Sequence, residues 1–166
     1  VHQVMMEWEK PYMEKCIEPL DPSGSVLEIG VGMGYSAEKL CSFENVTEYT
    51  VIECSPVVWE RFETFKKELN KKNPSLKINI IKGRWQDMLP SANIFDCIFF
   101  DDYNGGISHE AANRFSVFLY NLLVNKHTKV GSKIGAYSTC ILQHKIVGLE
   151  CENKEYLIDV PKHCKY

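Results

Sequence analysis

The stretch Val26–Ser36, "VLEIGVGMGYS", joins an apolar run to three closely spaced glycines and decides our interpretation of the fold. The apolar run indicates a buried β-strand, and Gly30, Gly32 and Gly34 allow the backbone to turn sharply and to approach a ligand closely. A helix is expected to begin at Tyr35, with its positive end facing the loop. This order of strand, loop and helix favours a nucleotide-type ligand, although a glycine loop alone is a weak signal.

The rest of the chain alternates short β-rich runs with helical stretches. We expect strands over residues 25–29, 48–53, 77–81, 96–100 and 133–138, and helices over 3–20, over 55–72 and after Ser108. Pro11 should break the first helix near Trp8–Lys10. The alternation predicts an α/β fold: one domain, residues 1–166, with a doubly wound, mostly parallel sheet that binds ligands at the carboxyl ends of its strands. Two later runs, residues 145–151 and 155–160, suggest an antiparallel edge at the C-terminal side of the sheet.

Composition narrows the class of protein further. The 166 residues carry a formal net charge of −3, so nucleic acid is not expected as a partner. No apolar run spans a bilayer and no secretory leader is visible, so we expect a cytoplasmic protein without membrane contact. The seven cysteines are odd in number and form no CxxC pair, so we expect reduced cysteines and no metal site.

Two features favour S-adenosylmethionine over a dinucleotide as the ligand of the loop, and a third, an acid after the second strand, agrees with it but also occurs in dinucleotide folds. The dinucleotide fingerprint requires a third glycine at position 35, which is Tyr35 here. An acid two residues before the first glycine, Glu28, is typical of S-adenosylmethionine sites, where the ligand carries an ammonium and a sulfonium. Glu53 ends the second expected strand, where it can accept hydrogen bonds from both ribose hydroxyls. The alternative is that Glu53 is an ordinary surface acid.

The segment "KGRWQD", residues 82–87, follows the third expected strand. Trp85 offers a flat face to an adenine, and Gln86 or Asp87 could pair with its amino edge. Alternatively, Trp85 is a core aromatic residue and Asp87 a helix cap. Taken together, the loop and the polar residues at three successive strand ends predict an S-adenosylmethionine-dependent methyltransferase.

Two adjacent acids, Asp101 and Asp102, end the fourth expected strand and should face the methyl group. Several carboxylates at one site suggest a cation with several N–H donors, and a guanidinium offers five in a planar fork. Carboxylates could localise its charge and accept the proton that the nitrogen loses. Glu9, beside the break in the first helix, could grip the fork from the other side. Alternatively, Glu9 is a solvated helix residue and Asp101 a turn former.

Several motifs together resemble one family. The stretches "VMMEWEKPYM" (4–13), "VLEIGVGMG" (26–34), "VIEC" (51–54), "KGRWQD" (82–87), "FDCIFFDDY" (95–103) and "VPKHCKY" (160–166) occur in that family's order. The chain resembles guanidinoacetate N-methyltransferase and its relative, the fungal-type protein arginine N-delta methyltransferase. Some motifs look more like the first enzyme and some more like the second, so the resemblance leaves the substrate open.

The resemblance implies roles for individual residues. Glu9 and Asp101 take the positions of the guanidino-binding, catalytic carboxylates, and Asp102 stands where the family usually has a small hydroxyl residue. Ala136 and Tyr137 match the contact region for the far end of a small substrate. The implied cofactor contacts are Met5 and Met13 of the first helix, Val31, Gly32, Met33, Gly34, Tyr35 and Ser36 of the loop, Glu53, Cys54 and Ser55 of the ribose segment, and Trp85 and Gln86 of the adenine segment.

Three hypotheses follow. The favoured one is direct methyl transfer from S-adenosylmethionine to a small guanidino substrate such as guanidinoacetate. The second is methylation of an arginine in a protein. The third is a catalytically weak relative that binds cofactor or a partner protein, which is the expectation if the segments that cover the family's active site are missing. An aminopropyltransferase shares the fold, but no run of this sequence prefers it.

Overall fold

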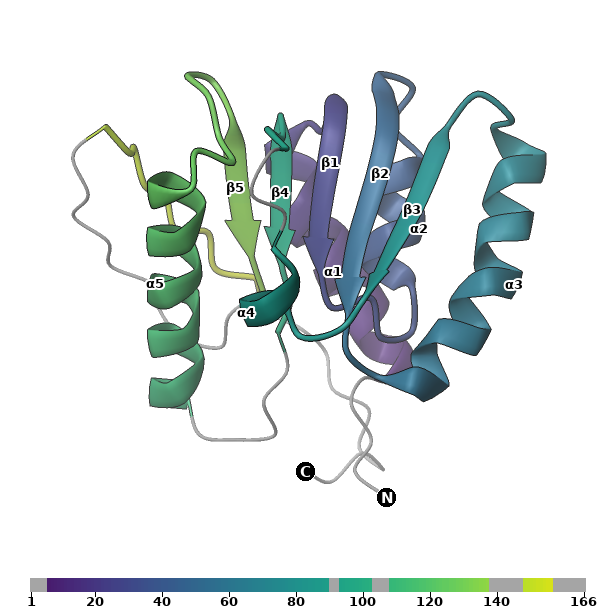
Figure 1. The fold of residues 1–166 in the computed structure, drawn as a ribbon, viewed down its shortest axis with the longest axis horizontal. Helices are drawn as coiled ribbons and strands as arrows, with labels where there is room; N and C mark the ends of the chain where they lie inside the picture. Colours follow the sequence, from purple (N-terminus) through teal and green to yellow (C-terminus); the bar gives the residue numbers. More distant parts are fainter. Residues whose placement is uncertain (1–5, 90–92, 103–107, 138–147, 157–166) are drawn as a thin grey trace.

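A five-stranded parallel sheet organises the computed structural model (Figure 1), which describes residues 6–89, 93–102, 108–137 and 148–156. The strands lie in the order β3-β2-β1-β4-β5, and every neighbouring pair is parallel. Their bounds are β1 Gly24–Ile29, β2 Val46–Glu53, β3 Lys77–Lys82, β4 Cys97–Phe100 and β5 Lys133–Ala136. The order reverses between β1 and β4, because the chain first winds outward from β1 to β3 and then returns to the other side.

Helices cover both faces of this sheet, as the alternating sequence predicted. They are α1 Lys10–Ile17, α2 Tyr35–Cys41, α3 Pro56–Lys72, α4 Trp85–Met88 and α5 Ser108–Val124, with short 3-10 turns η1 Glu7–Glu9 and η2 Glu18–Leu20 on either side of α1. The doubly wound α/β fold is therefore confirmed.

Each face of the sheet has its own hydrophobic core. The α1–α3 core contains residues of those three helices and the strand residues that point toward them, among them Met13, Leu40, Phe62, Tyr49 and Phe99. The α4–α5 core contains Trp85, Phe118 and Leu122 with strand residues such as Leu27 and Phe100. Successive β4 residues alternate between the two cores, as the period of a β-strand requires.

Pro11 has the effect on the first helix that the sequence predicted. The chain enters as the 3-10 turn η1, and α1 begins at Lys10, so Pro11 occupies the first turn of the helix, where its missing N–H costs nothing. Lys10 forms an ion pair with Glu38 of α2, which ties the two helices together. The segment around Glu9 is thereby set apart from α1 itself.

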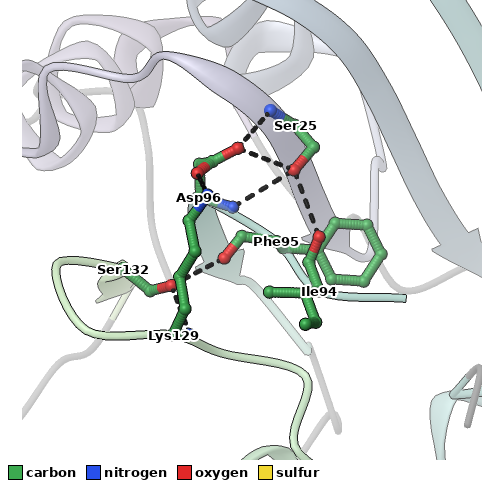
Figure 2. A network of polar contacts seen from close by, with 6 residues as sticks. All are labelled: Ser25, Ile94, Phe95, Asp96, Lys129 and Ser132. Carbon is green, nitrogen blue, oxygen red and sulfur yellow. Dashed lines mark hydrogen bonds and ion pairs between the residues drawn. The ribbon is translucent and has the colours of Figure 1, made fainter. Parts of the chain in front are cut away.

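The amino ends of the strands are joined by a polar network (Figure 2). The Asp96 carboxylate accepts hydrogen bonds from the Ser25 backbone N–H and hydroxyl, both at 3.0 Å, and forms an ion pair with Lys129. Ser132 donates to the Phe95 carbonyl oxygen at 2.7 Å. The Lys129 ammonium, followed by the bonds from Ser25, holds the pKa of Asp96 below its usual value. This network connects β1, β4 and the chain before β5 at the end of the sheet away from the glycine loop.

The expected antiparallel edge is not supported. All five strands are parallel, and the described parts of the two stretches that suggested the edge, residues 148–151 and 155–156, form no strand. The remaining residues of both stretches lie outside the described part of the chain. An apolar run of this length does not by itself distinguish a strand from irregular chain.

Candidate functional site

The carboxyl ends of β1, β2 and β4 lie at one level. Ile29 is in register with Ile52 on one side and with Phe100 on the other. The next residues continue the pattern, because the Gly30 N–H donates to the Ile52 carbonyl and the Asp101 N–H donates to the Ile29 carbonyl, both at 2.9 Å. The glycine loop and the acidic residues after β4 therefore meet at the point where the strand order reverses, the usual ligand site of such sheets.

Gly30 is required where the loop leaves β1. Its φ is +78°, and a Cβ at this position would lie 2.3 Å from the backbone oxygen of Asp101. Only glycine fits both the backbone conformation and the close approach. The loop that begins at Gly30 and the Asp101 backbone are consequently in direct contact.

Glu53 holds the loop in place from β2. One carboxylate oxygen accepts the Val31 N–H at 3.0 Å, and the other accepts the Ser55 N–H at 2.8 Å. Each carboxylate oxygen can accept a second hydrogen bond, so the side chain, although only 6% exposed, could still receive a ribose hydroxyl. Glu53 thus stands where the sequence predicted the ribose-binding acid, and it also fixes the backbone around the site.

Glu28 supports the loop from below. Its side chain is 0% exposed, and its carboxyl group receives hydrogen bonds from the hydroxyls of Ser36 and Tyr49. Burial raises the pKa of Glu28 to about 8, against the two hydrogen bonds, and the charges of Asp101 and Glu53 add to the rise. The structure therefore gives Glu28 a position beneath the loop with no surface that a ligand could contact. Tyr49, which sequence reasoning did not single out, is its partner from β2.

The two adjacent aspartates point to opposite faces of the sheet. Phe99 belongs to the α1–α3 core and Phe100 to the α4–α5 core, and the alternation continues past the end of the strand. Asp101 accordingly lies on the side of α1, where it interacts electrostatically with Glu9, and Asp102 lies on the side of α4 and α5. Only one of the two carboxylates is directed toward the predicted guanidine site.

Asp101 lies in a strongly acidic environment. Burial first, and then the negative charges of Glu9, Asp102 and Glu53 in that order of size, together raise the pKa of Asp101 to about 7. A neighbouring cation would reverse this effect, because opposite charge favours the ionised form. The site is thus suited to a cationic ligand and carries a carboxyl group that titrates near neutral pH.

Glu9 reaches the same site from η1. Its carboxylate accepts the Met6 N–H at 2.6 Å and the Tyr137 hydroxyl at 3.4 Å. The first bond fixes the side chain to its own turn, and the second connects it to the chain that follows β5. The structure brings together Glu9, Asp101 and Tyr137, three of the four residues expected to bind the acceptor, and Ala136, the last residue of β5, precedes Tyr137.

An aromatic wall, which sequence reasoning missed, flanks Glu9. The Tyr12 ring of α1 packs edge to face on Tyr137, with centroids 5.4 Å apart, and on Tyr156 at 6.1 Å. Burial raises the pKa of Tyr12 to about 12 and that of the neighbouring Cys16 thiol to about 11, so both side chains stay neutral. Tyr12 lies within the quoted "WEKPYM" motif, but its contact with Tyr137 could not be read from spacing.

The adenine segment differs from the expectation in one respect. Trp85 is only 5% exposed, because its ring packs edge on against Phe118 and Phe100 in the α4–α5 core, with centroids 5.3 and 6.0 Å away. Its indole N–H donates to Asp102 at 2.6 Å. Little of the predicted flat face is free, whereas Gln86 and Asp87 are exposed.

The other residues expected to contact the cofactor are distributed as follows. Met13 is 0% exposed within the α1–α3 core, so it supports the site from within, and Met5 lies outside the described residues. The loop residues Val31, Gly34 and Ser36 are buried, Gly32 and Tyr35 are half-buried, and Met33 is exposed; after β2, Cys54 is exposed and Ser55 half-buried.

An open cavity of about 200 Å³ lies between the glycine loop and α3. It is lined by Val31, Gly32, Met33, Gly34, Val58, Arg61, Phe62, Thr64, Phe65 and Glu68. None of the acidic residues that meet at the strand ends lines it, so we do not identify it with the guanidine site.

The chemistry of the strand ends fits S-adenosylmethionine. The loop turns through three glycines with positive φ, and beside it Glu9 and Glu53 act electrostatically on Asp101, so acidic groups gather where a sulfonium and an ammonium would be favoured. Within the described segments no helix is long and apolar enough to cross a membrane. The same segments contain no group of three His, Cys, Asp or Glu side chains that could hold a metal ion.

Sequence relatives agree with the geometry. Among curated proteins, the chain is 32% identical over 108 residues to protein arginine N-methyltransferase 2 of Aspergillus oryzae and 30% identical over 106 residues to the protein of that name from Emericella nidulans. Each match covers 60% of this chain and 24% of the relative. The chain therefore matches about a quarter of the length of these relatives.

Solved structures show the same fold at low identity. The SAH-bound methyltransferase PaMTH1 of Podospora anserina has a TM-score of 0.52 at 20% identity and covers 80% of this chain and 53% of its own. An O-methyltransferase of Bacillus cereus in complex with SAH has a TM-score of 0.53 at 17% identity, over 80% of this chain and 56% of its own. The fold is therefore that of the Rossmann-like methyltransferases.

The family assignment rests on a longer match. The sequence pattern of guanidinoacetate N-methyltransferase matches residues 1–149, most of the chain, which include η1, the glycine loop and both strand-end aspartates. Methyltransferases of this kind use S-adenosylmethionine as the methyl donor. The chain thus belongs to the guanidinoacetate N-methyltransferase family.

Proposed function

We propose that this protein methylates a nitrogen of a guanidino group with S-adenosylmethionine, and that a guanidinoacetate-like small guanidine is the favoured acceptor. The observation that carries the proposal is the electrostatic coupling of Glu9 and Asp101, which come from elements far apart in the sequence and meet beside the glycine loop. Two carboxylates facing one crevice match the planar fork of N–H donors on a guanidinium.

The two carboxylates have different tasks. Glu9 is held by the Met6 N–H and the Tyr137 hydroxyl, so it is oriented before a substrate arrives and retains further acceptor positions. Asp101, whose pKa is raised to about 7, chiefly by burial, is suited to accept a proton near neutral pH. Glu9 therefore orients the guanidinium, and Asp101 localises its charge and takes the proton that the attacking nitrogen loses.

The cofactor would be held by the chain's own loop and strand-end residues. Glu53 receives the ribose hydroxyls, the glycine loop accommodates the amino acid portion, and Gln86 or Asp87 contacts the adenine edge. When bound, S-adenosylmethionine supplies a methyl group activated by its sulfonium. The close approach of Gly30 to the Asp101 backbone would keep the Asp101 carboxyl group beside the loop that holds the cofactor.

Methylation of an arginine within a protein is the second candidate. Two curated relatives, whose matches cover 60% of this chain, are named protein arginine N-methyltransferase 2. The side chain of arginine carries the same guanidinium, so Glu9 and Asp101 would serve equally. If neither acceptor is methylated, the third hypothesis remains, in which this protein is a weak catalyst that binds cofactor or a partner protein.

Transfer of a labelled methyl group to guanidinoacetate and to an arginine-containing peptide tests the proposal. Transfer to guanidinoacetate supports the favoured acceptor, and transfer to the peptide alone supports the second. Glu9→Gln and Asp101→Asn should each abolish transfer and largely spare S-adenosylhomocysteine binding, whereas Glu7→Gln removes an exposed acid from the same turn and should leave turnover unchanged. Unchanged turnover in both site variants would overturn the assigned roles.

A further inference from the structure

We propose that Arg114 is a positioning residue of this site: by holding Asp102 against α4 and α5, it leaves Asp101 as the one aspartate presented to a guanidinium and sets the charge that Asp101 experiences. The inference rests on the proposed function only where it refers to a guanidinium. It concerns a residue on α5 that no motif of the sequence singled out.

The contacts of Asp102 carry the first step. Its Oδ2 accepts hydrogen bonds from the Trp85 indole N–H at 2.6 Å and from Arg114 Nε at 2.9 Å, and it forms an ion pair with Arg114 Nη2. The Asp102 side chain is only 14% exposed. One carboxylate oxygen thus connects α4, the end of β4 and α5, with the guanidinium of Arg114 compensating its charge.

The contacts that fix Asp102 also determine the direction of the Asp101 side chain. Residues 101 and 102 continue the alternation of β4, so fixing Asp102 on the α4–α5 side keeps Asp101 on the side of α1, near Glu9. Without Arg114, Asp102 would be a nearly buried carboxylate with an indole N–H as its remaining partner in the contacts described above. A buried carboxylate without a compensating charge tends to turn toward solvent or toward another cation. The nearest proposed cation is the guanidinium that would bind beside Asp101.

The charge of Asp102 is also felt by Asp101. The groups that act on Asp101 or respond to it are Glu9 of η1, Cys16 of α1, Glu28 of β1, Glu53 of β2 and Asp102 itself. All of these are acids or a thiol, and Arg114 is the cation paired with one of them. Removing Arg114 should therefore make Asp101 harder to ionise, and removing the Asp102 charge should make it easier.

Titration of the cofactor-free protein tests this directly. Carboxyl-carbon NMR of aspartate-labelled protein, with the Asp101 signal assigned by Asp101→Asn, gives its titration midpoint. We expect Arg114→Gln to raise the midpoint, Asp102→Asn to lower it, and Arg114→Lys to stay close to the parent protein. Lys71→Gln removes a positive charge from the exposed side of α3 and should leave the midpoint unchanged.

The two shifts of opposite sign separate charge compensation from loss of structure. Asp102→Asn keeps an acceptor for the Trp85 indole, so it serves as the test if Arg114→Gln does not fold. An unchanged midpoint in either variant, or a shift of the same sign in both, would overturn the inference. Methyl transfer plays no part in this titration, so a protein that methylates no guanidine but shows both shifts would refute only the proposed function.

Discussion

Lowering the pH from 8 to 6 should weaken guanidine binding about tenfold, because Asp101 must be ionised to pair with a guanidinium. Burial and three neighbouring acids raise the pKa of Asp101 to about 7, so about nine tenths of the molecules carry the charge at pH 8 and about one tenth at pH 6. The cation lowers that pKa in the complex, so the apparent affinity follows the ionised fraction. A tenfold change is about 1.4 kcal/mol.

Calorimetric titration of guanidinoacetate, or of an arginine peptide, into protein saturated with S-adenosylhomocysteine measures this change at pH 6, 7 and 8. At pH 7, binding should release about half a proton, which buffers of different ionisation enthalpy reveal. Asp101→Asn should bind weakly with little pH dependence, and Glu7→Gln should retain the full dependence. Equal affinity at pH 6 and pH 8, with no proton released, would refute the assignment of Asp101 as the titrating acceptor carboxylate.

Three further expectations concern the loop, the buried acid and the aromatic wall. Gly30→Ala should lower the free energy of unfolding by a few kcal/mol, more than Gly32→Ala, because both glycines have positive φ but only Gly30 is pressed against another backbone; urea denaturation compares them. The free energy of unfolding should fall as pH rises from about 5 to 8, because Glu28 in the folded protein, with a pKa of about 8, keeps a proton that the unfolded chain releases. Glu28→Gln should make this fall less steep, and an unaltered slope in that variant would contradict the prediction. Tyr137→Phe should weaken guanidine binding about two- to tenfold and leave S-adenosylhomocysteine binding unchanged in calorimetry, because it removes one hydrogen bond to Glu9.

The sequence was sufficient for the parallel sheet and for the level at which the strands end. Apolar runs alternating with helices gave the strand positions to within a few residues, and Pro11 marked the change from η1 to α1 beside Glu9. Local patterns determine these features. The position of the strand-end acids could also be predicted, because parallel strands with aligned carboxyl ends bring residues 53 and 101 close to the loop.

Contacts between segments that are distant in the chain could not be predicted from the sequence. Asp102 was expected to face the methyl group together with Asp101, but its contacts with Trp85 and with Arg114 on α5 show that it faces the other side of the sheet. Trp85 was expected to offer a free face, but the rings of Phe100 and Phe118 bury it. No local pattern reports which aromatic rings of two elements will meet.

The contact between Gly30 and the Asp101 backbone makes the glycine loop and Asp101, the proposed acceptor carboxylate, parts of one mechanical unit. A ligand that displaces the loop must also move or restrain Asp101, since no side chain lies between the two backbones to absorb the shift. Occupancy of one site should therefore alter the affinity of the other, and thermodynamic reciprocity requires the same factor in both directions.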